Sequence, residues 1–377
     1  MKTTKKLLAL ALAMGMLTVS AGCADQSWSY KDDMNTLSIG TYIYYMSGAY
    51  GYASNQVSSA QTESATQSGT EAATEAVDVL TQEIENPDGD KVNAQDYILQ
   101  EAENACKNLL NTEKLFAQKG LTLSETELTA AESNADQAWS YYGQTYESLG
   151  VSKDSFYRAE YLFAAKYNAL FEAIYGIGGE KAVSDDEIKA YFTENYTNYA
   201  YLPMNLYTTA DSESDDASST TSTAVAFNEE EVQQATEEFN AYAQQINDGS
   251  KTYDEIAQAY TTDAGLEENP SVTNTEILED SSLGDELKEA LEGLDANQAT
   301  VIQVGEDSTA VLYLVYKGDI HEEAENVFEE SQRSSVLYSM KFEEYQEDMD
   351  AQAKAYECEK NDAAINRYQP SMFKDVL

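Results

Sequence analysis

Clusters of acidic side chains are the first candidates for chemistry in this 377-residue chain, which has 68 Asp and Glu residues. The richest cluster, residues 211–216, reads Asp-Ser-Glu-Ser-Asp-Asp and offers carboxylates that could bind calcium. It lacks the glycine turn and the closing glutamate of an EF-hand loop, and Asp88-Gly-Asp lacks the same parts. We therefore interpret 211–216 as a solvated loop and assign no metal and no cofactor. Chance carboxylate pairs are inevitable among so many acids, so none is singled out for glycoside hydrolysis.

The single histidine, His321, limits the nucleophilic and metal chemistry open to the chain. One histidine cannot form a His-rich metal site or a two-histidine active site. No Gly-x-Ser-x-Gly elbow is present, and no histidine is placed to act as its base, so the usual serine hydrolases are excluded. Gly176-Ile-Gly-Gly is not followed by Lys-Ser/Thr, which favours a helix end over a phosphate loop. We expect His321 to be exposed near a helix start, and we assign no catalytic residue.

Cys23 is the candidate for covalent lipid attachment. A basic start, an apolar run over residues 7–19 and the small residues Ser20-Ala21-Gly22 precede it, a pattern typical of a secretory signal. The apolar run is too short for a comfortable membrane-spanning helix. The small residues followed by cysteine resemble the bacterial lipobox, whose cysteine becomes the lipidated first residue, although Ser20 stands where leucine is usual. We predict a lipoprotein signal peptide over 1–22 and a lipid anchor at the outer face of the bacterial cell membrane; cleavage by an ordinary signal peptidase stays open.

The other two cysteines, Cys106 and Cys358, show no spacing that favours pairing. Two half-buried thiols on helices are the preferred interpretation, and a disulfide between them stays open.

The tyrosines are the most informative residues, since the chain has 28 of them. One group lies near the N-terminus, at Tyr42, Tyr44, Tyr45, Tyr50 and Tyr52. Packing in a core explains an aromatic helix face, but tyrosine also suits a surface that accepts varied peptides, because it buries area and keeps a polar tip. The candidates for binding such peptides are Tyr141, Tyr142, Tyr146, Tyr157 and Tyr161.

Composition restricts the partners. The formal net charge is −46, and it becomes −49 once residues 1–22, with three lysines and no acid, are removed. Such a chain is repelled by phosphate backbones, so no nucleic-acid binding is expected. The hydrophobic fraction of 42% is enough for a packed core. No later segment has 18 successive apolar residues.

The elements that position these residues follow from apolar spacing. Residues 27–38 are predicted to be extended, and residues 39–50 have one apolar helical face. Residues 53–86 are of low complexity over most of their length, and we predict a disordered or loosely helical insert. Four amphipathic helices follow within 93–197, two of them opened by the capping boxes Ser124-Glu-Thr-Glu and Ser184-Asp-Asp-Glu. These helices can bury their stripes only against one another, which predicts an N-terminal helical domain over 23–197.

From residue 198 the pattern changes to strand, three helices and a closing hairpin, which predicts a small α+β domain over 198–320 with an antiparallel sheet. Residues 321–377 become helical again, with one long polar helix from 322 to about 366. The predicted fold class is therefore mainly α, with an inserted α+β module and a helical domain built from both chain ends.

This order of segments resembles the PrsA/SurA-type extracytoplasmic foldases, in which a parvulin-like peptidyl-prolyl isomerase module interrupts a helical chaperone domain. The stretches that carry the resemblance are Asn247-Asp-Gly-Ser-Lys-Thr-Tyr-Asp-Glu-Ile-Ala-Gln-Ala-Tyr-Thr-Thr-Asp-Ala-Gly, Asp285-Glu-Leu-Lys-Glu-Ala-Leu-Glu-Gly-Leu, Val183-Ser-Asp-Asp-Glu-Ile-Lys-Ala-Tyr-Phe and Asn361-Asp-Ala-Ala-Ile-Asn-Arg-Tyr-Gln-Pro. The family places one histidine in the first strand of the module and another in the last. Here neither strand has one, and a Gly-Gly-Asp-Leu-Gly-type segment is also missing.

The resemblance implies a membrane-anchored chaperone for unfolded or partly folded exported polypeptides, with an isomerase-like module that is weakly active or inactive. Prolyl isomerisation breaks no covalent bond, and its barrier of roughly 18–20 kcal/mol is lowered by twisting and desolvating the amide. The alternative is a surface lipoprotein that binds a small ligand or a cell-wall partner and has no folding role. The common solute-binding architecture of such lipoproteins has two α/β lobes. It would need strands and helices that alternate along the sequence, and the chain does not show this alternation. Self-association into a homodimer stays open.

Overall fold

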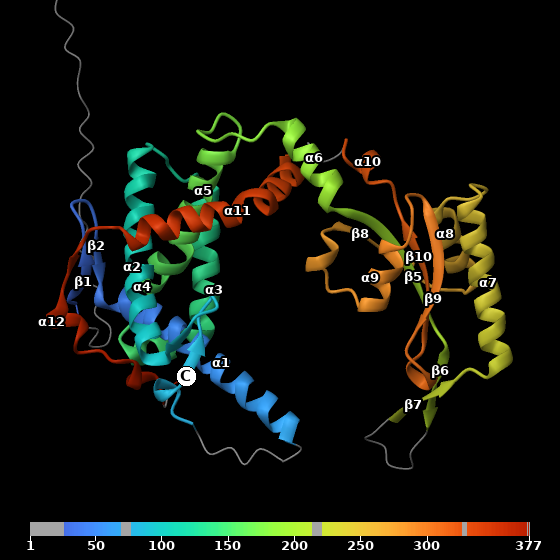
Figure 1. Cartoon of the computed structure of the whole chain (residues 1–377), viewed down its shortest axis with the longest axis horizontal. Coiled ribbons are helices and arrows are strands. Elements are labelled where there is room, and N and C mark those ends of the chain that lie inside the picture. Colours follow the sequence, from blue (N-terminus) through green and yellow to red (C-terminus); the bar gives the residue numbers. More distant parts are fainter. Residues whose placement is uncertain (1–25, 69–76, 213–220, 326–329, 375, 377) are drawn as a thin grey trace, which may run out of the picture. The chain divides into compact units, whose positions relative to one another are not determined.

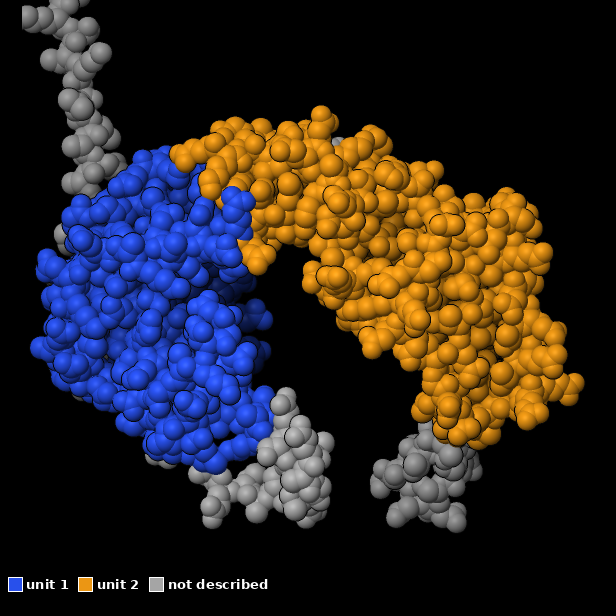
Figure 2. All heavy atoms as spheres, in the orientation of Figure 1, with its two compact units in different colours: residues 1–174, 344–377 blue, residues 175–343 orange. Residues whose placement is uncertain are grey.

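The computed structural model describes residues 26–68, 77–212, 221–325, 330–374 and 376, and it divides into two compact units (Figures 1 and 2). Unit 1 comprises Met1–Ile174 and Glu344–Leu377, and unit 2 comprises Tyr175–Glu343. The predicted fold class, mainly α with an inserted α+β module, is confirmed. Among the described residues, no helix is long and apolar enough to cross a membrane.

Unit 1 is a helical body with short strands at both ends of the chain. From the N-terminus its elements are β1 (Trp28–Lys31), β2 (Thr36–Ser38), α1 (Ile39–Ser68), the 3-10 turn η1 (Val79–Thr81), β3 (Glu83–Glu85), β4 (Lys91–Asn93), α2 (Ala94–Gln118), α3 (Glu125–Leu149), α4 (Lys153–Tyr157), the π-helical turn η2 (Arg158–Leu162) and α5 (Phe163–Tyr175). Helix α11 (Glu330–Lys354) runs from unit 2 into unit 1, and β11 (Glu359–Lys360), α12 (Asp362–Ile365) and η6 (Pro370–Phe373) follow it.

The chain ends of unit 1 meet in a small antiparallel sheet with strand order β11-β1-β2. Tyr30 pairs with Lys360, and the Asn361 amide donates a hydrogen bond of 2.8 Å to the Trp28 carbonyl. The C-terminal segment therefore completes the helical unit, as the predicted fold class requires.

Helices α1 and α2 pack against each other and build the core of unit 1. Apolar side chains at helical spacing, among them Ile43 and Leu109, are fully buried between them. Burying one such side chain contributes about 1.5–3 kcal/mol. Phe373 of η6 closes the core against Tyr50, with ring centroids 5.5 Å apart.

For residues 53–86 the helical alternative is confirmed as far as Ser68, whereas disorder is wrong for residues 77–86. Helix α1 continues to Ser68, and residues 77–86 hold η1 and the first strand of the β3–β4 hairpin. Ala53 and Val57 extend the apolar stripe of Met46 and Tyr50 and are buried in the core. The polar composition of the segment concealed this stripe. Residues 69–76 lie outside the described residues.

Unit 2 contains a four-stranded antiparallel sheet with strand order β8-β5-β10-β9. Its elements are α6 (Asp185–Asn195), β5 (Thr197–Asn205), β6 (Tyr207–Ser212), β7 (Thr221–Ala226), α7 (Glu229–Asn247), α8 (Tyr253–Asp263), β8 (Val272–Glu276), η3 (Leu278–Asp280), α9 (Asp285–Glu292), β9 (Gln298–Val304), η4 (Asp307–Thr309), β10 (Val311–Lys317) and α10 (Ile320–Glu323).

Helices cover both faces of this sheet (Figure 1). Because side chains alternate along a strand, neighbours in β5 face opposite ways. One face packs Ala200, Leu202, Leu312 and Leu314 against Phe239 of α7 and Ile256 of α8, and the other packs Tyr199 and Val315 against Leu287 and Leu291 of α9.

The predicted domain boundaries, at 197/198 and 320/321, differ from the boundaries of the two units. Helix α6 and the first part of α11 belong to unit 2, where the Arg333 side chain binds Asp185 at 3.0 Å and the Val183 carbonyl at 3.1 Å. The predicted helix over 322–366 is also corrected, because α11 ends at Lys354 and the chain then forms β11.

Candidate functional site

Four of the five tyrosines predicted to bind peptides lie on one aromatic surface of unit 1. We define the aromatic surface as Tyr44 of α1, Trp139, Tyr141, Tyr142 and Tyr146 of α3, Phe156 of α4 and Tyr161 of η2. Tyr141 is 75% exposed and Tyr142 is 60% exposed, and their ring centroids are 6.4 Å apart. Tyr142 lies one helical turn before Tyr146, and Tyr141 contacts Tyr142.

Phe156 is the centre of this surface and is only 3% exposed. Its ring contacts four other aromatic rings, at centroid distances of 5.4–5.5 Å, and these belong to Tyr44, Trp139, Tyr146 and Tyr161. Tyr146 also stacks on Trp139, with ring planes 18° apart. Such a network fixes the orientation of these rings, because each aromatic contact adds about 0.5–1.5 kcal/mol beyond simple burial.

Helix α3 supplies most of the surface because Trp139, Tyr142 and Tyr146 recur at helical spacing. The helix begins at the predicted capping box of Ser124 and Glu127, which is present, and it ends at Gly150 with a left-handed backbone. Gly143 makes room for the indole, since a Cβ atom there would lie 2.7 Å from Nε1 of Trp139.

Two hydroxyl groups of α1 fix the π-helical turn η2 under the surface. Tyr44 donates to Glu160 at 2.6 Å, and Tyr45 donates to the Ala159 carbonyl at 2.9 Å. A π turn disturbs the regular i→i−4 ladder and is often found at functional sites. Burial and then the charge of Glu160 raise the pKa of Tyr146 and of Tyr161. Both phenols therefore stay protonated and can donate hydrogen bonds.

Tyr157, the fifth predicted residue, faces elsewhere. Burial and the nearby Glu132 carboxylate raise the pKa of its phenol, which places it beside the earlier part of α3. Within the described part of the chain, no ring contact joins it to the aromatic surface.

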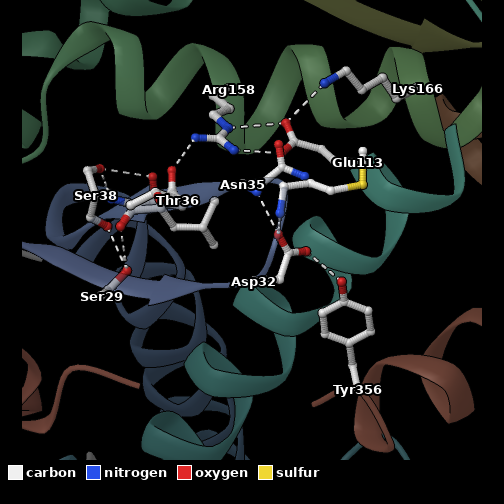
Figure 3. A network of polar contacts seen from close by, with 12 residues as sticks. Ser29, Asp32, Asn35, Thr36, Ser38, Glu113, Arg158, Lys166 and Tyr356 are labelled. Carbon is white, nitrogen blue, oxygen red and sulfur yellow. Dashed lines mark hydrogen bonds and ion pairs between the residues drawn. The ribbon is translucent and has the colours of Figure 1, made fainter. Parts of the chain in front are cut away.

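A buried ion network also holds η2, through Arg158 (Figure 3). Glu113 of α2 has a side chain only 6% exposed, and it accepts hydrogen bonds of 3.1 and 2.5 Å from Arg158 and one of 3.0 Å from Lys166. Arg158 also donates to the Thr36 carbonyl at 2.7 Å. Burial raises the pKa of the Glu113 carboxyl, but the hydrogen bond and charge of Arg158, helped by Lys166, outweigh it and hold that pKa below its ordinary value.

The same network reaches the C-terminal segment through Asp32, in the turn between β1 and β2. One carboxylate oxygen accepts from the backbone amides of Met34 and Asn35, and the other accepts from the Tyr356 hydroxyl at 2.6 Å (Figure 3). Sequence reasoning did not predict the contact with Tyr356, because Asp32 and Tyr356 are 324 positions apart in the chain.

In unit 2, the strands that the family resemblance would pair across a prolyl pocket lie side by side. Leu202 of β5 is opposite Leu314 of β10, and both are buried. His321 lies beyond the sheet, exposed at the start of α10, where its backbone amide donates to the capping carboxylate of Asp319. The predicted place of His321 is confirmed, and neither strand carries an imidazole.

The cysteines and the acidic cluster are the remaining candidates from the sequence. Cys106 is buried and Cys358 half-buried, and both are free thiols. Cys23 and the predicted signal peptide lie outside the described residues, as do residues 213–220, which hold most of the acidic cluster. Over the described ranges, no group of three or more His, Cys, Asp or Glu side chains is arranged to hold a metal ion.

Comparison with known proteins gives structural similarity only. No protein-family model matches the chain, and no curated protein matches it. The chain is similar to the crystal structure of foldase protein PrsA from Streptococcus pneumoniae str. Canada MDR_19A, with 16% identity, 78% of this chain and 99% of that chain covered, and a TM-score of 0.34. It is also similar to the crystal structure of PrsA from Bacillus subtilis, with 13% identity, coverage of 73% and 93%, and a TM-score of 0.27. At these values the similarity says nothing of what this chain binds or catalyses.

Proposed function

We propose that the chain is a lipid-anchored extracytoplasmic chaperone that holds unfolded or partly folded exported polypeptides. The observation that carries this proposal is the exposed pair Tyr141 and Tyr142 on the aromatic surface of unit 1. The anchor at Cys23 rests on the sequence pattern before it.

An exposed pair of tyrosines on a fixed aromatic base has the properties that a chaperone surface needs. Each ring offers a large apolar contact at little cost in conformational entropy. Each hydroxyl can form a hydrogen bond with the backbone of an unfolded polypeptide of any sequence. The base formed by Phe156, Trp139 and Tyr146 is already packed, so binding orders few additional protein side chains. Such a surface favours exposed apolar segments of many sequences.

The net charge supports the same role. At −49 after removal of residues 1–22, the chain repels other copies of itself and stays dispersed beside a crowded membrane. A holding protein with exposed aromatic rings needs this protection against its own aggregation.

We propose no pairing surface. A homodimer stays a prediction, which the sedimentation coefficient of the mature chain would check.

We further propose that unit 2 acts as a binding or spacing module rather than as an isomerase. The central strands β5 and β10 carry buried leucines at Leu202 and Leu314, and the chain has no pair of histidines to frame a prolyl pocket. A protease-coupled assay with a proline peptide checks this directly. Turnover clearly above the uncatalysed rate would contradict it.

The chaperone proposal is tested by aggregation of a purified acidic client unfolded by reduction. Because the client is acidic, its net charge opposes binding, and suppression must come from apolar contacts. The mature chain at several-fold excess should suppress light scattering, and the variant Tyr141→Ser/Tyr142→Ser should lose most of this effect. Tyr338→Ser, which removes a 41% exposed tyrosine from unit 2, is the matched control. No suppression by the unaltered chain would overturn the proposal.

A further inference from the structure

A second surface of unit 1 has a different chemistry from the aromatic surface. A hollow of about 460 Å³ lies between α2, the β3–β4 hairpin and the C-terminal end of α11. A neighbouring hollow of about 730 Å³ extends toward residues 365–369. The two hollows share Asp96, Gln100, Asn104 and Lys354 in their walls, so they form one groove along the exposed side of α2.

The first hollow is short of positive charge. Four carboxylates line it against the single ammonium of Lys354, and they belong to Asp88, Asp96, Glu101 and Asp350. The side chains of Glu101 and Asp350 are exposed at the wall of the hollow. Partial desolvation there, followed by the charge of Asp350 on Glu101 and of Asp88 on Asp350, raises the pKa of both carboxyls. Lys354 only partly offsets these effects, so an additional cation would stabilise the ionised carboxylates.

The second hollow has more lysines than carboxylates in its wall, with Lys107, Lys354 and Lys360 against Asp96 and Glu103. Its lysines Lys107 and Lys360 both bind Glu103, at 2.9 and 2.7 Å. Burial would raise the pKa of Glu103, but the two lysines outweigh it and lower that pKa to about 2. The need for a cation is therefore confined to the first hollow.

The remaining groove walls suit a polypeptide. Tyr45, Tyr97 and Phe163 supply apolar and aromatic surface in the first hollow. Side-chain amides line both hollows, and an amide N–H can donate to a backbone carbonyl even where its oxygen accepts within the chain, as those of Asn86, Asn93 and Asn108 do. These amides belong to Asn86, Asn93, Gln100, Asn104, Asn108, Asn366 and Gln369.

We infer that this groove binds an extended polypeptide segment and places one of its Lys or Arg side chains in the first hollow, beside Glu101 and Asp350. The inference rests on the proposed chaperone function. It adds a preference for basic segments, which the aromatic surface lacks because tyrosines bind apolar segments without regard to their charge. The client class is thus an unfolded segment that carries a basic residue.

The test measures binding of three fluorescein-labelled decapeptides of glycine, serine and tyrosine, with three lysines, three glutamines or three glutamates, to the mature chain. The lysine peptide should bind most tightly, and Glu101→Gln/Asp350→Asn should weaken it about tenfold while changing the glutamine peptide less than twofold. Glu194→Gln/Glu289→Gln removes the same charge from exposed positions of unit 2 and is the matched control. It should change the affinity for the lysine peptide less than twofold.

Three results would overturn the inference. Equal weakening by both double variants would show attraction to net charge alone, and equal binding of the lysine and glutamine peptides would show no selection of a cation. Complete displacement of the lysine peptide by millimolar N-acetyl-lysine amide would show a site for a small cation instead of a polypeptide.

The same variants separate this inference from the proposed function. Glu101→Gln/Asp350→Asn should still suppress aggregation of the acidic client, because the aromatic surface is intact. Suppression without any preference for the lysine peptide would overturn the groove alone. A chain that neither suppresses aggregation nor binds any of the peptides would overturn both.

Discussion

The hydroxyl of Tyr44 donates a hydrogen bond of 2.6 Å to Glu160, across 116 residues of sequence. Tyr44 lies at the edge of Tyr146 and of Phe156, with ring centroids 5.4 Å away in both cases. One contact therefore joins α1 to η2 and fixes the Tyr44 ring against Tyr146 and Phe156. The aromatic surface depends on this long-range contact as much as on helix α3.

Removal of this hydrogen bond should loosen the surface without unfolding the unit. We expect Tyr44→Phe and Glu160→Gln each to lower the free energy of unfolding by about 1 kcal/mol, since hydrogen bonds to charged groups contribute modestly when water can replace them. Urea unfolding of both single variants and the double variant measures the coupling. If the single effects simply add, the two side chains do not act as a pair.

Gly143 should tolerate no side chain. Alanine is favoured over glycine in a helix by about 1 kcal/mol, yet a Cβ at this position would lie 2.7 Å from the Trp139 ring. We expect Gly143→Ala to displace the indole, to lower stability and to change the Trp139 fluorescence in a Trp28→Phe background. Gly48→Ala is the matched control, because Gly48 is helical with nothing within 4 Å of its Cβ position, and it should stabilise. A stabilised Gly143→Ala with unchanged fluorescence would contradict the packing described.

The buried network around Glu113 should carry much of the stability of unit 1. Glu113→Gln leaves Arg158 and Lys166 without their shared anion, and loss of one partner from a buried pair costs roughly 3–5 kcal/mol. Asp136→Asn is the matched control, since the Asp136–Lys153 pair, 2.6 Å apart, is exposed and contributes less than about 1 kcal/mol. Thermal unfolding measures both variants. Equal losses of stability in Glu113→Gln and Asp136→Asn would show that burial of the Glu113 pair adds nothing.

The pH dependence of the same pair follows from the lowered pKa of Glu113. A carboxyl with a lowered pKa in the folded state contributes stability above its unfolded pKa of about 4.3, and it loses that contribution as the pH falls through the folded value. The stability difference between the unaltered chain and Glu113→Gln should therefore be constant near neutral pH and shrink below about pH 4. A stability difference between the two chains that grows as the pH falls would contradict the lowered pKa of Glu113.

Several of these elements were predictable from sequence because their signals are local. The capping boxes of Ser124 and Ser184 mark the starts of α3 and α6 as expected, and apolar spacing identified α2 and the β9–β10 hairpin. The continuation of α1 was predicted only as an alternative to disorder, although Ala53 and Val57 keep the spacing of Tyr50. Small apolar residues in a polar segment give a weak signal, and the buried partners of α1 decide the outcome.

The sites were only partly predictable. Tyr141, Tyr142 and Tyr146 could be named from their clustering, but their exposure depends on what α3 packs against. The groove brings together side chains as distant as Asp88 and Asp350, and no local pattern indicates that pairing. The π turn at Arg158–Leu162 is held by hydrogen bonds with Glu113 and Tyr45, which are also remote in sequence.

The most direct test of the central claim is photo-crosslinking from the aromatic surface. Benzoylphenylalanine placed at Tyr142 of the mature chain should capture a purified unfolded client and not its folded form, and the same group at Tyr338 in unit 2 should capture neither. Equal capture at both positions, or equal capture of the folded client, would contradict the proposal that unit 1 holds unfolded chains on this surface.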